Sequence, residues 1–322
     1  MTDIRSSAVT AAPPAAGGVP RRLPRRHPFR WLALAVILVL AAMFAHGLVT
    51  NPNLQWDVVR HYFTSADVLR GLRVTIELTA GTMIISIVLG TAVAALQMSG
   101  GPLLAGVAGV YVWVLRSVPL LVQLLFWFNI SALYPRLSLG VPFGPEFVSG
   151  NVNAFMTPWV AALVGLGLEG SAFVAETVRA GIRSVEPGQT EAARALGLRG
   201  PAIFRWIVLP QAIPVIIPSL ANILVITLKA TALVSVISLS DLLYTVETIY
   251  GRTYQPIPLL LTATIWYLIL TLLLTLLQRG LERRFGRSAR RGAPAPLWRD
   301  ALAGLGSGLA RFVVPSNRRA AR

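Results

Sequence analysis

The chain has 322 residues, of which 55% are hydrophobic and only 13% charged, and its mean hydropathy is +0.65. A soluble globular protein of this length needs more polar surface than such a composition provides, so we expect a membrane protein. The absence of cysteine excludes disulfides, thiolate metal sites and cysteine nucleophiles. The three histidines, His27, His46 and His61, do not have the spacing of metal ligands.

Positive charge is concentrated in three stretches of the chain. The formal net charge is +16, which in a soluble protein would suggest a nucleic-acid partner. Here the arginines cluster in residues 21–30, 179–205 and 279–322, beside apolar segments, which is typical of the cytoplasmic side of a membrane protein. No recognition motif or basic stripe with interleaved aromatic residues accompanies the charge, so we expect no nucleic-acid partner.

The first 30 residues form a basic tail, and its first twenty are rich in Ala, Pro, Gly and Ser, a composition typical of disorder. An apolar stretch follows at residues 31–48. It is interpreted as an extra N-terminal span. A basic leader before an apolar segment is also the pattern of a secretory signal peptide, and its cleavage would leave five spans with the central loop on the same side.

Six apolar stretches have roughly the 20 residues needed to cross about 30 Å of hydrocarbon. They cover residues 31–48, 74–96, 118–133, 158–178, 212–235 and 259–277. Crossing the membrane alternately, they place both termini and the central loop in the cytoplasm, with 22 of the 29 basic residues. The sequence therefore predicts an all-α, multi-pass membrane protein, because separate helical spans satisfy every backbone amide within lipid.

The simplest partition is a membrane domain at residues 31–285 between a basic tail at 1–30 and another at 286–322. Small residues recur on its spans. The glycines concerned include Gly81, Gly90, Gly165, Gly167 and Gly170. They would let helices approach closely, as in ordinary helix packing within a membrane.

The loop between the fourth and fifth spans contains a less apolar insert. Pro187 ends the preceding helix, and Gln189 or Thr190 can start a short new one. The apolar side of this helix would consist of Ala192, Ala193 and Leu196. Gly197 suits the left-handed residue that ends a helix, and Pro201 suits the first position of a second helix. We therefore expect two short helices at the membrane surface.

This loop, residues 186–210, resembles the signature cytoplasmic loop of permease subunits of binding-protein-dependent ABC importers. The matching residues are Glu191, Ala192, Ala193, Gly197, Ile207, Leu209 and Pro210. The resemblance implies that the loop inserts into a groove on an ATPase subunit, with the two alanines allowing close approach and Glu191 bonding to the partner. The coupling residues it implies are Glu191, Ala192, Ala193, Leu196, Gly197 and Pro210. The alternative is a surface elbow between two spans.

More of the chain is similar to one branch of this family, the permeases for polar amino acids. The similarity is carried by Gly71, Leu72 and Thr75; by Arg116, Pro119, Leu120, Leu121, Val122 and Gln123; by Ala172, Ala175, Glu176, Arg179, Gly181, Ile182, Ser184, Val185, Gly188 and Gln189; and by Lys229, Thr231, Leu233 and Ile237. It spans residues 71–284 and implies a five-helix permease core. Ala230 and Ala232 depart from the branch pattern, which leaves the particular substrate open.

The resemblance also implies partners. These are a cytoplasmic ABC ATPase dimer, an extracytoplasmic binding protein and a second permease copy, identical or related, in the plasma or inner membrane of a prokaryote. A phosphate-binding loop needs Gly-Lys-Ser or Gly-Lys-Thr, and the only lysine, Lys229, lies between Leu228 and Ala230. We therefore expect ATP and Mg to be used by the partner, no cofactor or metal on this chain, and no enzymatic activity of its own.

Two other classes of function were compared with a transporter. A membrane hydrolase would need a zinc-type His-Glu-His spacing or a Gly-x-Ser-x-Gly elbow, and the sequence contains neither. A non-transporting scaffold or sensor would account for the spans and the charge, but it would leave the signature loop without a role. A permease for a related small amine-containing solute stays open.

Charge within the spans is the best sequence guide to a substrate path, because burying it is expensive. Glu169 lies about eleven residues, or roughly 17 Å, into the fourth span, and is the leading candidate for an amine-binding carboxylate. An ion pair with Lys229 is the equal alternative. Thr231 and Ser235 are further candidates, although such hydroxyls also bond to their own helix backbone.

Overall fold

A computed structural model describes residues 28–140 and 146–285, and these ranges are almost entirely helical. Most of the two predicted tails, residues 1–27 and 286–322, lies outside the described residues. The chain divides into two compact units, Met1–Pro52 and Asn53–Arg322, which we describe separately. The predicted all-α class is confirmed.

The described part of the first unit is one helix, α1, at Pro28–Thr50. It covers the predicted first span and continues for two residues beyond it. Residues Leu32–Thr50 have a mean hydropathy of 2.6, and none of them is buried against protein. By length and composition this helix can cross a membrane. A helix that is apolar on all sides needs such an apolar environment unless it is buried in protein. A short 3-10 turn, η1, follows at Pro52–Leu54.

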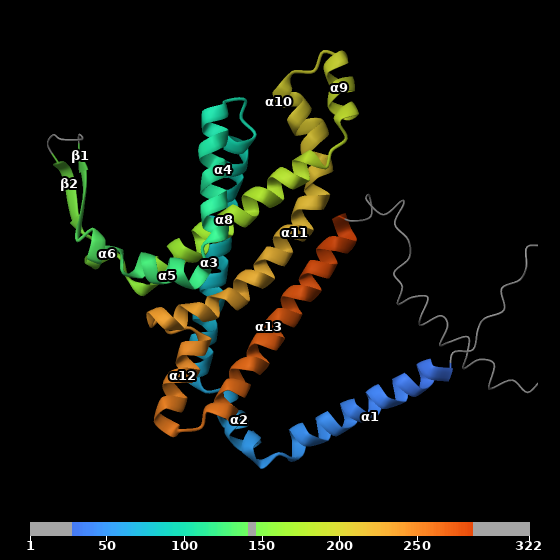
Figure 1. The fold of residues 1–322 in the computed structure, drawn as a ribbon, viewed down its shortest axis with the longest axis vertical. Helices are drawn as coiled ribbons and strands as arrows, with labels where there is room; N and C mark the ends of the chain where they lie inside the picture. Colours follow the sequence, from blue (N-terminus) through green and yellow to red (C-terminus); the bar gives the residue numbers. More distant parts are fainter. Residues whose placement is uncertain (1–27, 141–145, 286–322) are drawn as a thin grey trace, which may run out of the picture. The chain divides into compact units, whose positions relative to one another are not determined.

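The second unit is a helical bundle (Figure 1). Its larger helices are α2 Trp56–Phe63, α3 Ala66–Gln97, α4 Pro102–Ser117, α5 Leu120–Phe128, α8 Pro158–Arg183, α11 Leu209–Ala230, α12 Leu242–Thr253 and α13 Pro256–Phe285. Its shorter pieces are α6 Ile130–Leu133, α7 Val152–Phe155, α9 Pro187–Ala195, α10 Gly200–Ile203, the π-helical turn η2 Phe204–Val208 and the 3-10 helix η3 Thr231–Ile237. In Figure 1, α9 and α10 lie at one end of the bundle, and α2 and α12 at the other.

Among the described residues, five helices are long and apolar enough to cross a membrane, or six if one bent pair counts as a single span. That pair, α4 and α5, corrects the predicted third span at residues 118–133. The helix breaks at Val118 and Pro119, and the two halves meet at 101°. Pro119 has no N–H to donate and holds Val118 in an extended conformation. The apolar run therefore splits, and most of the crossing length lies in α4, which the sequence did not predict.

Close packing between α3 and α8 holds the centre of the bundle. A Cβ at Gly90 would lie 2.6 Å from the backbone oxygen of Ser171, and one at Gly167 would lie 2.8 Å from the Ile85 side chain. Gly170 likewise lies directly against the Ser86 side chain. The expectation that small residues allow close approach of the helices is confirmed at these positions.

One small sheet departs from the otherwise helical structure. Strands β1 (Arg136–Gly140) and β2 (Glu146–Asn151) form an antiparallel pair between α6 and α7, with Arg136 opposite Asn151 and Ser138 opposite Ser149. Residues 134–157 were expected only to link two spans, and the short alternating runs were not recognised as strands.

Candidate functional site

The predicted coupling loop folds into a helical elbow, which we define as residues 186–210. Gly197 follows α9 with a φ of 79°, the left-handed conformation that glycine adopts without strain. The Leu198 amide donates to the Ala193 carbonyl at 3.1 Å, and the Gly197 amide donates to the Arg194 carbonyl at 2.9 Å. These are the two bonds of a Schellman cap, so the predicted helix end at Gly197 is confirmed.

The starts of the elbow helices differ from the prediction by one to three residues. Helix α9 begins at Pro187, not at Gln189 or Thr190, because the first turn of a helix needs no backbone donor at that position. Pro201 is the second residue of α10, after Gly200, where it was expected to be the first. Both prolines therefore start helices in the elbow.

A wide turn connects the elbow to the next long helix. In η2 the Leu209 amide donates to the Phe204 carbonyl, five residues back instead of four. Pro210, exposed at the start of α11, has no N–H to continue the regular pattern. The π-helical turn accommodates this missing donor, and such turns are frequent at functional sites.

The side chains of the elbow fall into two sets. Ala193 is buried with Ile203 and Val208 in a small apolar core, whereas Ala192 and Leu196 are exposed, so the three residues do not form one apolar side of α9 as expected. Glu191, Ala192 and Leu196 all face outward, and Leu196 is 83% exposed. Trp206, which the sequence interpretation left without a role, is 70% exposed. The elbow thus presents a surface that mixes charged and apolar side chains.

A second feature is a polar cleft of about 630 Å³ between α4 and α8. Its polar lining consists of Gln97, Arg116, Ser117, Glu176, Arg179 and Arg183, and its aromatic lining of Trp113 and Phe173. Arg179 donates to Glu176 through both Nε, at 3.1 Å, and Nη2, and Arg116 Nη1 lies 3.9 Å from Glu176 Oε2. Charge within apolar helices is expensive, so this cleft is a candidate path for a polar solute.

The structure separates the two residues that were expected to form an alternative ion pair. Glu169 lies in the middle of α8 and is half-buried, whereas Lys229 is exposed in the last turn of α11. No ion pair among the described residues joins them, so this structure does not support the pairing. Glu169 lies one helical turn before Phe173, on the side of α8 that leads into the cleft.

The two hydroxyl candidates differ. Thr231 is fully buried, and its hydroxyl donates to the Leu228 carbonyl at 2.7 Å. This is a bond to its own helix backbone, the expected alternative to a role in the substrate path. Ser235 is half-buried in η3. Neither residue lines the cleft between α4 and α8.

A buried polar hub lies at the end of the bundle opposite the elbow, and we define it by Thr75, Thr231, Asp241 and Tyr267. Asp241 caps α12 by accepting from the Tyr244 amide at 2.8 Å, and its second carboxylate oxygen accepts from the Tyr267 hydroxyl at 3.4 Å. The Thr75 hydroxyl accepts from the Leu242 amide at 3.1 Å. The Thr75 and Thr231 hydroxyls also lie within hydrogen-bonding reach of Tyr267. The hub therefore joins α3, η3, α12 and α13.

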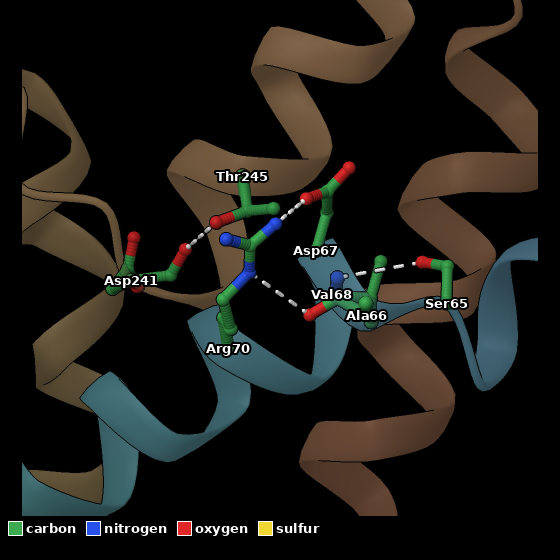
Figure 2. Close-up of polar contacts among 7 residues, drawn as sticks. All are labelled: Ser65, Ala66, Asp67, Val68, Arg70, Asp241 and Thr245. Atoms are coloured by element: carbon green, nitrogen blue, oxygen red, sulfur yellow. Dashed lines mark hydrogen bonds and ion pairs between the residues drawn. The ribbon is translucent and has the colours of Figure 1, made fainter.

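Figure 2 shows the contact of Asp241 with Thr245 and the polar contacts at the nearby start of α3. The Thr245 hydroxyl donates to the Asp241 carbonyl oxygen at 2.7 Å, and on the neighbouring turn of α3 Arg70 bonds Asp67 and the Ala66 carbonyl. Asp241 is completely buried, and this burial raises its pKa to about 6. Sequence reasoning passed over Asp241, although its place directly after a long apolar span was a signal that could have found it.

Comparison with known proteins agrees with this architecture. Residues 86–287 match the family described as binding-protein-dependent transport system inner membrane component. The arginine transport system permease protein ArgU of Corynebacterium glutamicum is 38% identical over 276 residues, covering 83% of this chain and 84% of the relative. The glutamate/aspartate import permease protein GltK of Escherichia coli O157:H7 is 32% identical over 216 residues, covering 67% and 92%.

Two solved structures share the fold. An amino acid ABC transporter with histidines matches with a TM-score of 0.59 and 33% identity, over 68% of this chain and 94% of the other. The inward-facing MetNI methionine ABC transporter matches with a TM-score of 0.56, over 68% and 96%; at 19% identity it supports the fold alone. The resemblance to the polar amino acid branch is confirmed by these relatives. The chain belongs to the family of binding-protein-dependent transport system inner membrane components.

Proposed function

We propose that this chain forms half of the translocation pathway of an ATP-driven importer for a polar or charged amino acid. The observation that carries the proposal is the elbow. Its Schellman cap and its small core of Ala193, Ile203 and Val208 fix its shape from within, while Glu191 and Leu196 face outward. A rigid, exposed helical element at one end of a membrane bundle suits insertion into a partner.

The partner that fits this element is a cytoplasmic ABC ATPase dimer, one subunit for each of two permease copies. The second permease is identical or related. ATP and Mg belong to the ATPase, since the sequence contains no phosphate-binding loop, and an extracytoplasmic binding protein delivers the solute at the other end of the bundle. Closure of the ATPase subunits moves the elbows, and the spans reorient between outward and inward access.

The charge distribution supports an orientation. The elbow carries Arg194, Arg199 and Arg205, and the end of α13 carries Arg283 and Arg284. Basic residues beside spans collect on the cytoplasmic side, so both termini and the elbow lie in the cytoplasm of a prokaryotic cell, with the chain in its plasma or inner membrane.

The relatives support the substrate class. The names of similar permeases specify arginine, or glutamate and aspartate, and these solutes share the ammonium and carboxylate groups of an amino acid. Glu169, in the middle of α8 and one turn from the polar cleft, is suited to bind the ammonium group. The substrate is thus an amino acid with a polar or charged side chain.

The elbow is tested by Glu191→Lys and Gly197→Leu in the complete complex. We expect both to abolish ATP-dependent uptake of radiolabelled L-arginine into vesicles while the protein stays in the membrane. A Cβ at Gly197 meets nothing within 4 Å in this chain, so the leucine does not clash with its own chain. It should instead strain the backbone, which has a positive φ here, and clash with the partner surface. Gly100→Leu, also open but without a positive φ, is the matched control. Normal uptake by both elbow variants would favour a scaffold or sensor.

Glu169 is tested separately by Glu169→Gln. The substitution keeps the shape of the side chain and removes the charge, so uptake of L-arginine should fall about tenfold, as expected when one charge-assisted hydrogen bond is lost. The measurement is initial uptake at saturating binding protein. Uptake equal to that of the wild type would assign Glu169 a structural role only.

A further inference from the structure

The cleft between α4 and α8 contains three arginines and one carboxylate. Arg116 comes from α4, and Arg179 and Arg183 come from α8 together with Glu176. The described lining therefore has a surplus of positive charge near the C-terminal ends of α4 and α8. Such a surplus favours an anionic group on whatever enters the cleft.

The arginines of the cleft differ in how firmly they are held. Arg179 is bonded to Glu176 through two nitrogens and is 28% exposed. Arg116 reaches Glu176 only at 3.9 Å, is 44% exposed, and makes no hydrogen bond within the described residues. Its five N–H donors are therefore available to a ligand, whereas those of Arg179 are partly used.

The Arg116 side chain also contacts an aromatic ring. Its guanidinium carbon lies 5.3 Å from the centroid of the Phe173 ring, within the range of a cation–π contact. A cation–π contact uses no N–H donor, so the guanidinium can still bind a carboxylate in a bidentate manner. The Phe173 ring thus contacts the Arg116 guanidinium without using its N–H donors.

The backbone on both sides of Arg116 is fixed as well. The Gln123 side-chain amide donates to the Leu115 carbonyl and to the Val118 carbonyl, each at 2.9 Å. These carbonyls belong to the residue before Arg116 and to the residue at the 101° bend between α4 and α5. Gln123 therefore anchors the short segment from which the arginine reaches into the cleft.

We propose that Arg116, placed on Phe173, binds the carboxylate of the transported amino acid. This proposal rests on the proposed function and deepens it. Phe173 contacts the Arg116 guanidinium, and Glu169 precedes Phe173 by one turn of α8, so the helix position that would serve the ammonium group is close to the one that serves the carboxylate. Arg116 and Phe173 are binding residues for the group that all amino acids share, and the side chain is selected elsewhere.

The experiment measures binding to the purified permease–ATPase complex in nanodiscs. The binding protein is left out, because it has an amino-acid site of its own. The probes are radiolabelled L-arginine and radiolabelled L-histidine. Each is competed by its amine without the carboxylate, which is agmatine for L-arginine and histamine for L-histidine. We expect the wild type to prefer each amino acid to its amine, and Arg116→Gln to weaken amino-acid binding about 10- to 100-fold while changing amine binding less than about twofold.

Two further variants sharpen the test. Arg116→Lys keeps the charge but loses the planar fork, so it should recover part of the preference. Phe173→Leu removes the ring and should weaken amino-acid binding about threefold. Arg60→Gln, an exposed arginine on α2 outside the cleft, is the matched control and should bind as the wild type does.

The outcomes are distinguishable. If Arg116→Gln assembles and keeps the wild-type preference for L-arginine over agmatine, the carboxylate site is overturned and the importer function stands. If it does not assemble, Arg116→Lys decides by the same ratio, and an unchanged preference overturns the site. A wild-type complex that binds L-arginine, L-histidine and, as a further probe, L-glutamate no better than their decarboxylated amines overturns the carboxylate site, and one that binds none of these compounds contradicts the amino-acid substrate as well.

Discussion

The elbow and the hub lie at opposite ends of the bundle (Figure 1), and their candidate functional residues differ in burial. In the elbow, Glu191 and Leu196 face outward, and neither packs in the core that holds the elbow together. In the hub, Thr75 and Asp241 are fully buried, and each is bonded to groups of the same chain. Under the proposed function, residues of the first kind contact a partner and those of the second kind stabilise the fold, so variants should separate transport from stability.

The largest effect on stability is expected at the joint of α3 and α12. A Cβ at Gly71 would lie 2.7 Å from the Asp241 carbonyl oxygen, which is backbone and cannot move aside cheaply. Gly71→Val should therefore force the two helices apart and cost about 3 kcal/mol. The measurement is thermal unfolding of the purified complex in detergent.

Gly106→Val is the control for this variant, because a Cβ at Gly106 in α4 meets nothing within 4 Å. It should unfold within a degree or two of the wild type. Equal unfolding temperatures for the Gly71 and Gly106 variants would contradict the close contact of α3 with α12, and with it the description of the hub as the rigid end of the bundle.

The next effect is a dependence of stability on pH that comes from Asp241. Burial raises its pKa from 3.8 to about 6, so folding favours the protonated carboxyl. The stabilisation is complete below the unfolded pKa and is lost as the pH rises through about 6. Between pH 8 and pH 5 the free energy of unfolding should therefore increase by about 1 kcal/mol from this group.

Asp241→Asn checks the assignment. The amide oxygen can still cap α12 through the Tyr244 amide, but the side chain no longer titrates. The difference in unfolding temperature between variant and wild type should be larger at pH 8 than at pH 5, in favour of the variant. A constant difference across this range would mean that Asp241 does not titrate there.

The same contrast explains which parts were predictable from sequence. Helix ends set by local chemistry were predicted, as at Gly197, and so were the close contacts of Gly90 and Gly167, because one residue type meets the requirement. The bend at Pro119 was missed, since an apolar run gives the same hydropathy whether it is straight or broken. Asp241 was missed because its partners Thr75 and Tyr267 are far away in sequence.

Candidate site residues follow the same division. The sequence predicted an exposed loop, but the direction of each side chain depends on the core of the elbow, so Ala193 was placed with Ala192 although it packs on Ile203. Arg116 was identified from sequence as part of the similarity to the amino-acid permeases. Its contact with Phe173 joins residues 57 positions apart on two helices, which periodicity within either helix does not predict.

The smallest effect on stability is expected in the elbow. Leu196 is 83% exposed, so Leu196→Ala removes little packing within the chain and should change the unfolding temperature by less than about one degree. If the side chain enters a groove on the ATPase, its loss should lower ATP-dependent uptake about tenfold, as expected for an apolar anchor at an interface. Leu103→Ala, in α4 and 78% exposed, controls for the loss of an exposed leucine and should leave uptake unchanged. If Leu196→Ala is destabilised but transports normally, the contrast between elbow and hub is contradicted at this position. Leu196 would then stabilise the chain, as the hub residues do.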